Sequence, residues 1–485
     1  MNKKQTCTFE WLPDRSSKIP IYRQIIHFIS AQIQSGAWEV GTQLPSQRDL
    51  AAKLGVNRST ITTVMDELAA DGIIESNFKG GTRIISNTWA LLLSENSIWN
   101  RYVNLGSFKS NHAMIQAINR LEFTPSILRL GTGELDPALF PSELWKKAVK
   151  PLENIPSLNY LEASGLYQLR CAIVRYVTKF GIMATPDQVL ITSGSLQALQ
   201  LISVCILSAD SVVYTEAPTY LKSLQIFQSA GITLESIPMD EEGILHHRLP
   251  RTDQRTRILY TIPTNHNPTG ITMSNQRRKA LFEYCGVNRI PIIEDGAYEE
   301  LYFDKQHHQP IKQMDLNGDI IYLGTVSKTL SPGLRIGWVI ASEPIIDRLG
   351  DVKMQMDYGA SSVSQWIMTE FLNSGMYEQH LEQIRTEMEK RRDHGVRVLR
   401  QYLGDRVSFK SPAGGFYIWM RFNKKIPMQK LFEEAVKVGV LLNPGDIYDY
   451  APTNALRISY SYLSCGEFEE AVKRLAGITK RWFEV

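Results

Sequence analysis

The sequence has no paired cysteines and no long apolar run. Its five cysteines are scattered, their number is odd, and none belongs to a CxxC pair. This argues against a disulfide framework or a structural zinc site and favours a reducing compartment. No apolar stretch reaches the roughly 18 residues needed to span a bilayer, and the opening MNKKQTCTFEWLPD lacks the apolar core of a signal peptide. We therefore expect a cytoplasmic protein with no membrane partner.

An excess of charge of one sign is also absent, as are internal repeats and low-complexity tracts. The formal net charge is +3, and the shares of hydrophobic (43%) and charged (21%) residues are ordinary for a globular protein. Any contact with nucleic acid must therefore come from a local patch of basic residues. The length of 485 residues favours two or three domains.

Histidine is sparse, and its two adjacent pairs are the only hint of a metal site. These pairs are His246-His247 and His307-His308. Adjacent side chains point apart, and both pairs lie in polar, loop-like stretches, so we expect no bound metal.

Near the N-terminus the pattern is helix, short helix, helix and hairpin. From Tyr22 onward apolar residues recur at steps of three and four, which predicts an amphipathic helix that ends near Gly36. A second helix, SQRDLAAKLG, has Ser46 as its cap, and a third, RSTITTVMDELAADG, follows Asn57. The strand-like pieces GIIESN and TRIIS then flank a turn.

This order is typical of a winged helix-turn-helix DNA-binding domain. A major groove admits one helix, whose first residues meet base edges while neighbouring elements grip phosphate. Small hydroxyl side chains at the start of the third helix allow close approach. Phosphate or base contacts are expected from the basic residues Arg48, Arg58, Lys79 and Arg83.

Charge alone leaves open a small helical subdomain with solvated charges, because residues 1–85 hold ten Lys and Arg against eight Asp and Glu. However, the stretch LPSQRDLAAKLGVNRSTITTVMDELAADGII resembles the DNA-binding domain of the GntR family of bacterial repressors, and the resemblance covers roughly residues 18–86. It implies binding to double-stranded operator DNA. The implied contacts are Arg48, Arg58, Ser59, Thr60, Lys79 and Gly80.

After about residue 116, apolar β-branched runs alternate with helical stretches. The strand-like runs are VLIT, VVYT, RILYT, PIIE, DIIYLGTV and GWVIAS. Strands that alternate with helices predict an α/β fold with a mostly parallel central sheet and helices on both faces. In such sheets ligands bind beyond the carboxyl ends of the strands.

Five of these strands are followed by side chains of distinct chemistry. In chain order, these residues are Ser193-Gly194-Ser195, Tyr220, Asn267, Asp295 with Tyr298, and Ser327 with Lys328 and Arg335. Each alone has an ordinary explanation, such as a surface lysine, a helix cap, a core-edge tyrosine or a turn. Their joint placement at strand ends favours a functional site.

The group that these residues suit is pyridoxal 5′-phosphate (PLP). Lys328 supplies the amine for a Schiff base, and Asp295 can hold a proton on the pyridine nitrogen, which makes the ring an electron sink. Asn267, helped by Tyr298, can steady the phenolic oxygen, and Tyr220 can stack on the ring. The phosphate would be held by backbone N–H groups at a helix start and a cation, namely Gly194, Ser195, Ser327 and Arg335.

Residues 125–480 resemble the class I aminotransferases, fold type I of the PLP enzymes, through the motifs NHNPTG, EDGAYEEL and SKTLSPGLRIGW. The resemblance implies the α/β PLP-dependent transferase fold with a smaller C-terminal α/β subdomain. It implies that Tyr160 reaches across a homodimer to the neighbour's cofactor phosphate. It also implies that Arg457, with Gly133 nearby, binds a substrate α-carboxylate. His266 directly precedes Asn267 and is expected to be a spacer.

Four stretches are therefore expected. They are a tail (1–17), a DNA-binding domain (18–87), a linker (88–115) and a PLP-binding effector and dimerisation domain (116–485). A GntR-type reader joined to an aminotransferase-like body resembles the MocR/GabR type of bacterial regulators. That resemblance implies a homodimer with PLP as an aldimine on Lys328, and DNA binding that responds when an amino acid or amine forms an external aldimine there.

Two other functions stay open at this point. All groups needed for transamination are present, so the protein could be a genuine PLP-dependent aminotransferase that carries a DNA-binding domain. Alternatively, the large domain could be an inert dimerisation scaffold, in which case no PLP would be bound.

Overall fold

The computed structural model describes residues 11–17, 19–34, 38, 41–70, 73–77, 81–85, 111–155, 157–303 and 308–483. The chain divides into two compact units, residues 1–124 and 125–485. Most of the predicted linker, residues 88–110, lies outside the described residues, as do residues 1–10 of the predicted tail. Within the described ranges, no helix is long and apolar enough to cross a membrane.

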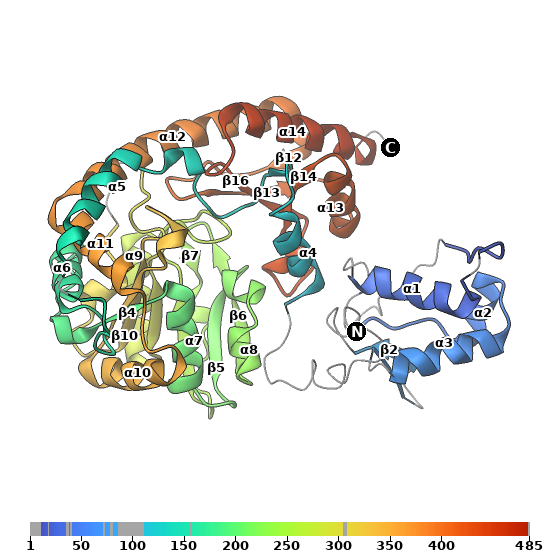
Figure 1. Cartoon of the computed structure of the whole chain (residues 1–485), viewed down its shortest axis with the longest axis horizontal. Coiled ribbons are helices and arrows are strands. Elements are labelled where there is room, and N and C mark those ends of the chain that lie inside the picture. The colour runs from blue at the N-terminus through green and yellow to red at the C-terminus, as the bar shows by residue number, and fades with distance from the viewer. Residues whose placement is uncertain are drawn as a thin grey trace. The chain divides into compact units, whose positions relative to one another are not determined.

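The first unit has the predicted order of elements (Figure 1). These are α1 (Ile21–Gln34), α2 (Gln47–Leu54), α3 (Arg58–Ala70), β1 (Ile74–Asn77) and β2 (Gly81–Ile84), with α4 (Ala113–Leu121) further along the chain. The two strands pair antiparallel. One apolar core joins the three helices to the hairpin, so this unit forms a winged helix-turn-helix.

The turn between α2 and α3 follows from local chemistry. The Ser46 hydroxyl accepts a hydrogen bond from the Asp49 N–H at 3.2 Å and so caps α2. Gly55 ends that helix with a φ of 63°, a left-handed conformation that glycine adopts at little cost. The Arg15 guanidinium donates to the Gly55 carbonyl at 2.7 Å, which holds the turn from outside.

The second unit is built on an eight-stranded sheet in the order β4-β11-β10-β9-β8-β5-β6-β7. The strands are β4 (Val189–Thr192), β5 (Val212–Ala217), β6 (Thr233–Asp240), β7 (Gly243–Ile244), β8 (Arg257–Thr261), β9 (Ile292–Asp295), β10 (Ile320–Thr325) and β11 (Gly337–Ile340). Only β11 and β7 run antiparallel to their neighbours. The carboxyl ends of the five predicted site-bearing strands therefore meet at one edge.

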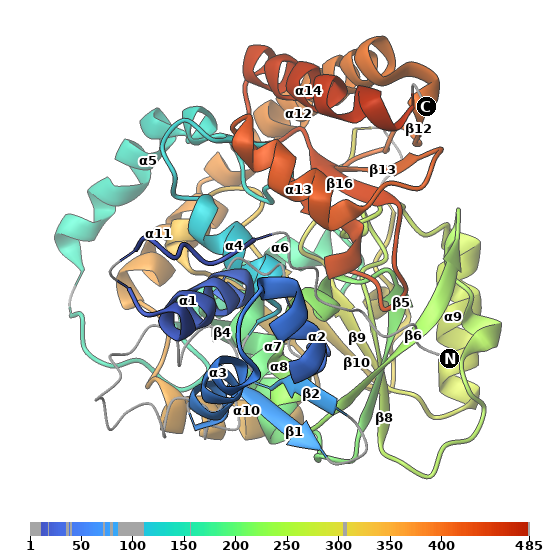
Figure 2. The same ribbon diagram turned by 90° about the vertical axis from the view of Figure 1, so that its right-hand side faces the viewer.

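Helices flank this sheet (Figures 1 and 2). They are α5 (Ser142–Val149), α6 (Tyr167–Thr178), α7 (Ser195–Cys205), α8 (Ile226–Ser229), α9 (Asn275–Val287), α10 (Glu343–Met356), α11 (Ser362–Asn373) and α12 (Met376–Leu403). One apolar core joins α6 and α11 to β4 and β11, and a second joins α9 to β5, β8 and β9. The strand β6 was not predicted, because its sequence, TLESIPMD, is mostly polar and only partly buried.

A smaller C-terminal α/β subdomain completes the second unit, as predicted. Its antiparallel sheet has the order β12-β13-β16-β15, and α12 and α14 lie side by side over it (Figure 2). The remaining elements are β12 (Val407–Ser408), β13 (Tyr417–Phe422), α13 (Met428–Lys437), β14 (Val440–Leu441), β15 (Asn443–Pro444), β16 (Ala455–Ser459) and α14 (Cys465–Thr479). The strand β3 (Leu128–Arg129) pairs with β14, which ties the start of the unit to its end.

Candidate functional site

Lys328 follows β10 at the carboxyl edge of the large sheet and is partly exposed. Its Nζ donates to the Gly133 carbonyl oxygen at 2.8 Å. Just before it, the Ser327 N–H donates to the Thr325 hydroxyl at 3.1 Å, which shapes the turn out of the strand. The amine therefore points from the strand end toward the loop that contains Gly133.

Asp295 ends the neighbouring strand β9 and is almost completely buried. Its carboxylate accepts hydrogen bonds from the Tyr260 hydroxyl at 2.7 Å and from the Ala297 N–H at 3.0 Å. Burial raises the pKa of Asp295, whereas these hydrogen bonds and the charge of Lys328 act in the opposite direction. The structure thus places a buried carboxyl within electrostatic range of the amine.

A pair of phenols faces the same region. The Tyr298 and Tyr417 hydroxyl oxygens lie 2.8 Å apart, and both side chains are buried. Tyr220 is the first residue of a short 3-10 helix after β5. Burial raises the pKa of Tyr220 to about 12, and the charges of Tyr417 and Asp295 add to this effect.

Arg457, on β16, is buried and held on several sides. Its Nη1 donates to Asn267 Oδ1 at 2.8 Å, and its Nη2 donates to the Gly131 carbonyl at 2.7 Å. The rings of Tyr417 and Tyr448 lie 4.3 and 4.8 Å from the guanidinium carbon. The Nε atom is buried without a hydrogen-bond partner among the described residues. A cation so prepared suits a carboxylate, whose two oxygens a guanidinium can bind together.

The predicted phosphate site is a crowded backbone turn at the start of α7. Gly194 has a φ of 84°, and a Cβ placed on it would lie 2.8 Å from Arg335 Nη2. A Cβ on Gly337 would lie 2.8 Å from the Gly194 carbonyl carbon. The Arg335 guanidinium donates to the Ser193 carbonyl. A helix N-terminus and a cation are therefore adjacent, as an anion requires.

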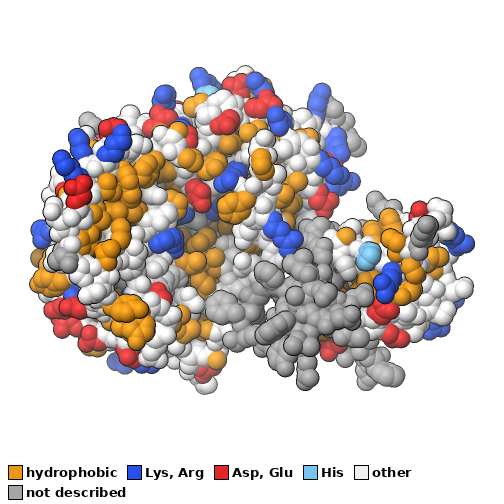
Figure 3. Space-filling view, in the orientation of Figure 1, with side chains coloured by type: hydrophobic (Ala, Val, Ile, Leu, Met, Phe, Trp, Pro, Cys, Tyr) orange, Lys and Arg blue, Asp and Glu red, His pale blue; other side chains and the backbone are white. Residues whose placement is uncertain are grey.

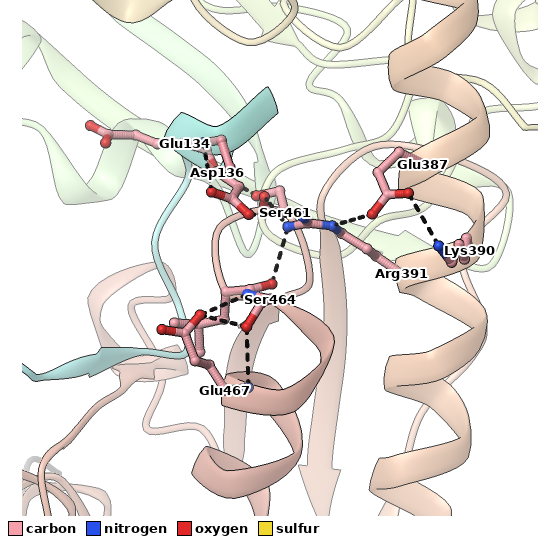
Figure 4. Close-up of polar contacts among 10 residues, drawn as sticks. Glu134, Asp136, Glu387, Lys390, Arg391, Ser461, Ser464 and Glu467 are labelled. Atoms are coloured by element: carbon pink, nitrogen blue, oxygen red, sulfur yellow. Dashed lines mark hydrogen bonds and ion pairs between the residues drawn. The ribbon is translucent and has the colours of Figure 1, made fainter. Parts of the chain in front are cut away.

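The loop that contains Gly131 and Gly133 is anchored by Arg391 on α12 (Figure 4). Arg391 Nη2 lies 2.8 Å from Asp136 Oδ2, and its Nη1 donates to the Leu463 carbonyl at 3.1 Å. The Ser461 hydroxyl donates to the Glu134 carbonyl at 2.7 Å. This network joins the loop to α12 and to the turn between β16 and α14.

His266 does more than separate its neighbours. Its Nδ1 lies 2.8 Å from the Thr269 hydroxyl, and its Nε2 lies 3.8 Å from Glu216 Oε2. Both side chains are buried, and Glu216 Oε1 accepts from the Ile262 N–H at 3.1 Å. Burial lowers the pKa of His266 to about 3 and raises that of Glu216 to about 7.

Tyr160 is separate from these groups within one chain. Its side chain is 83% exposed, and its ring lies 5.2 Å from that of Tyr358 beside a cavity of about 520 Å³. Exposure of this degree is compatible with the predicted contact to a second copy. That contact and the individual cofactor roles stay predictions.

The predicted DNA-contacting residues lie on the first unit. Arg48, Arg58 and Ser59 are exposed and Thr60 is partly exposed, the last three at the start of α3. Arg83 is paired with Glu75 at 2.9 Å. Lys79 and Gly80 lie outside the described residues. On the face of the large unit that Figure 3 shows, basic and acidic side chains are interspersed, so no broad basic patch is seen there.

The histidine pairs show no metal arrangement. The rings of His246 and His247 are 5.7 Å apart and nearly perpendicular, and His307 lies outside the described residues. In the described part of the chain, no three His, Cys, Asp or Glu residues are grouped as metal ligands.

Tyr417, Tyr260 and Gly131 were not predicted. Tyr417 belongs to PAGGFYIW, whose two glycines marked only a turn, and Tyr260 lies in an apolar strand. A signal for Tyr417 existed, because it begins the strand that pairs with the Arg457 strand.

Residues 125–475 match the family described as Aminotransferase class I and II. The chain belongs to this family. Residues 21–84 match the family described as Bacterial regulatory proteins, gntR family, so a gntR-type domain precedes the aminotransferase-like domain. This fold family is PLP-dependent.

Relatives and solved structures agree with both halves. The HTH-type transcriptional regulator YisV of Bacillus subtilis (strain 168) is 46% identical over 97% of this chain and 98% of its own. Multiple substrate aminotransferase from Thermococcus profundus is 32% identical, with a TM-score of 0.72, over 79% of this chain and all of its own. The alpha-aminoadipate aminotransferase LysN from Thermus thermophilus, complexed with N-(5′-phosphopyridoxyl)-L-leucine, is 30% identical, with a TM-score of 0.72, over 81% and 100%.

Proposed function

We propose that this protein is a PLP-dependent bacterial transcriptional regulator that binds operator DNA and senses an amino acid or amine at Lys328. One observation carries the proposal. The two cations suited to a ligand's nitrogen and carboxylate, Lys328 and Arg457, both donate to carbonyls of one short loop, at Gly133 and Gly131. The chain that contains this site also contains a gntR-type DNA-binding domain.

The residues around Lys328 fit PLP. A buried carboxyl, an amide, two phenols and a glycine-lined helix start with an arginine surround the amine, and together they match the cofactor's nitrogen, phenolic oxygen and phosphate. When bound, PLP supplies an electrophilic carbon and an electron sink. The residues that would hold it are Gly194, Ser195, Tyr220, Asn267, Asp295, Tyr298, Ser327, Lys328 and Arg335, with the partner's Tyr160.

Within the protein, Asp295 would keep a proton at the pyridine nitrogen, because its burial disfavours an uncompensated negative charge and favours sharing one. Arg457 would bind the ligand carboxylate after Asn267 or the Gly131 carbonyl yields a donor. Such an arrangement selects ligands that carry both an amine and a carboxylate over those with an amine alone.

A ligand can change the DNA-binding state only if it binds two conformations unequally. Here, the nitrogen of Lys328 and the guanidinium of Arg457 would exchange their loop carbonyls for the cofactor and the ligand. The loop would lose two charged donors at once. In sequence this loop follows α4 and the gntR-type domain, so its rearrangement is the proposed start of the signal.

On the DNA side, the start of α3 would enter the major groove. Arg58, Ser59 and Thr60 would meet base edges or phosphates there, with Arg48 on α2 and the wing residues Lys79 and Gly80 beside them. Two such domains in a homodimer would recognise a repeated or inverted half-site.

The test is a screen of amino acids and amines against the purified protein. Two readouts are followed in the same samples: the absorption of bound PLP and binding to duplex DNA from upstream of the protein's own gene. We expect at least one compound to change both. A colourless preparation that stays colourless after addition of PLP would instead indicate an inert scaffold.

A second candidate is a genuine aminotransferase with an attached DNA-binding domain. The similarity to aminotransferase structures at 30–32% identity favours it. Incubation with amino acids and a 2-oxo acid separates the candidates, because sustained turnover would identify an enzyme, whereas a single conversion without turnover would fit a sensor.

A further inference from the structure

Tyr417 contacts both halves of the site. Its hydroxyl lies 2.8 Å from that of Tyr298, and its ring faces the guanidinium carbon of Arg457 at 4.3 Å. A Cβ placed on Gly133 would lie 2.3 Å from the Tyr417 hydroxyl and 3.9 Å from Lys328 Nζ. One side chain therefore lies between the amine, the predicted ring-binding tyrosine and the carboxylate-binding arginine.

We propose that Tyr417 is a positioning residue for Tyr298: its hydroxyl fixes the direction in which the Tyr298 phenol donates. The inference rests on the proposed function, because Tyr298 matters only if a cofactor's phenolic oxygen lies in front of it. It assigns Tyr417 a task that neither the motifs nor the strand-end pattern indicated.

The two phenols have few protons to share. Each has one proton to donate and oxygen lone pairs to accept. The pair forms one hydrogen bond, so one of the two protons remains for a third group. If Tyr417 donates to Tyr298, the Tyr298 proton is directed outward. Burial raises the pKa of Tyr298 well above its ordinary value, so its proton is retained.

Tyr417 also cannot easily turn away. Its ring packs edge-on against Tyr298, with centroids 5.6 Å apart at 68°, and face-on against the Arg457 guanidinium. Its backbone belongs to β13, paired with β16 through Ser459. Gly133 leaves just enough room for the hydroxyl. A side chain held on every side is suited to orient its neighbour.

The functional consequence concerns the cofactor-bound nitrogen of Lys328. A donor aimed at the phenolic oxygen of PLP withdraws electron density that would otherwise hold a proton on that nitrogen. A better oriented Tyr298 therefore lowers the pH at which the nitrogen loses its proton. Removal of the Tyr417 hydroxyl should raise that pH, because Tyr298 would be free to rotate or to donate elsewhere.

The experiment compares Tyr417→Phe with Tyr460→Phe in the full-length protein loaded with PLP. Both changes remove one hydroxyl from a buried tyrosine, but the Tyr460 hydroxyl donates to the carbonyls of Gly414 and Gly415 instead. The readout is the pH midpoint of the change in cofactor absorption. We expect Tyr417→Phe to raise it by about one unit, a tenfold change in the proton equilibrium, and Tyr460→Phe to leave it in place.

A third variant keeps the test decisive if Tyr417→Phe does not fold. Tyr298→Phe removes the same hydrogen bond from the other side, so we expect a shift of the same sign. The double variant should add little to the larger single shift, because both changes break one chain of donors. An unchanged midpoint in Tyr417→Phe, or fully additive shifts, would overturn the role of Tyr417 and leave the proposed function intact. A wild-type protein that takes up no PLP would overturn the proposed function itself.

Discussion

Lys328 Nζ and the Gly133 carbonyl oxygen lie 2.8 Å apart, so the amine at the sheet edge is bonded to a loop 195 residues earlier in the chain. The same loop accepts from Arg457 through Gly131. Both bonds use charged donors, which makes them stronger than bonds between neutral groups. The loop conformation therefore depends on whether these two cations have other partners.

Lys328→Ala should remove the absorption of covalently bound PLP and blunt the response of DNA binding to ligand. The amine is the one group at the site that can form the covalent link. Because the DNA-binding domain is a separate compact unit, its DNA affinity without ligand should stay within about threefold of wild type, which corresponds to less than about 1 kcal/mol. Titration with each responsive compound checks this. A variant that still answered ligand normally would show that the lysine is not the switch.

Gly133→Ala should disturb the loop directly. The new Cβ would lie 2.3 Å from the Tyr417 hydroxyl, which is too close, so the loop or Tyr417 must move at a cost of about 1–3 kcal/mol. We expect lower thermal stability and weaker PLP retention, measured by melting and by dialysis.

The matched control for Gly133→Ala is Gly286→Ala, in helix α9. A Cβ there would meet no heavy atom within 4 Å, so the change should stabilise the protein by up to about 1 kcal/mol. Equal melting temperatures for the two variants would contradict the crowding at Gly133.

Much of this site could be predicted because strand order and chemistry coincide. Runs such as DIIYLGTV indicate buried parallel strands, and the residues that succeed parallel strands gather at one edge of the sheet. Lys328, Asp295 and Asn267 could therefore be assigned to that edge. Only local sequence and the rule for where such sheets bind ligands were needed.

The remaining residues depend on contacts between distant segments. Tyr417 and Gly131 approach the site from the C-terminal sheet and from a loop near the start of the unit, and no local pattern encodes that meeting. Arg391 likewise reads as one more charge on a long polar helix. The polar edge strand β6 was missed because edge strands need not be apolar on both faces.

Arg58→Ala should weaken DNA binding about tenfold and lower the salt dependence of the affinity, because an exposed cation at the start of α3 would release counterions on binding. Fluorescence anisotropy at two salt concentrations measures both effects. Arg248→Ala, which removes an exposed cation from the large unit, is the control and should change neither. Equal affinities for the two variants would contradict the assignment of α3 to the groove.

Asp136→Asn should destabilise the large unit by about 2 kcal/mol, because it leaves the buried Arg391 guanidinium short of one charged partner. Denaturant unfolding measures this. The comparison is Lys146→Met, which breaks an ion pair whose two side chains are 70% and 80% exposed and should cost less than about 0.5 kcal/mol. A small cost for Asp136→Asn would mean that the network in Figure 4 does not hold the loop.

Glu216→Gln tests the buried pair beside the Asn267 loop through the pH dependence of stability. In the folded protein burial raises the pKa of Glu216 from 4.5 to about 7, so the fold favours the protonated carboxyl. That contribution is fully present below pH 4.5 and is lost as the pH rises through about 7. Burial lowers the pKa of His266 from 6.5 to about 3, and its contribution is present above pH 6.5 and lost toward pH 3.

The two contributions therefore oppose each other between about pH 4.5 and 6.5, and Glu216→Gln removes only one of them. The variant's free energy of unfolding, relative to wild type, should rise by on the order of 3 kcal/mol from about pH 4.5 to 7.5. Other buried carboxyls cancel in this difference, because both proteins retain them. Glu143→Gln, whose side chain is 80% exposed, should show no such rise. A flat difference for Glu216→Gln would mean that the carboxyl is already ionised throughout this range, held by the Ile262 N–H and the Thr261 hydroxyl.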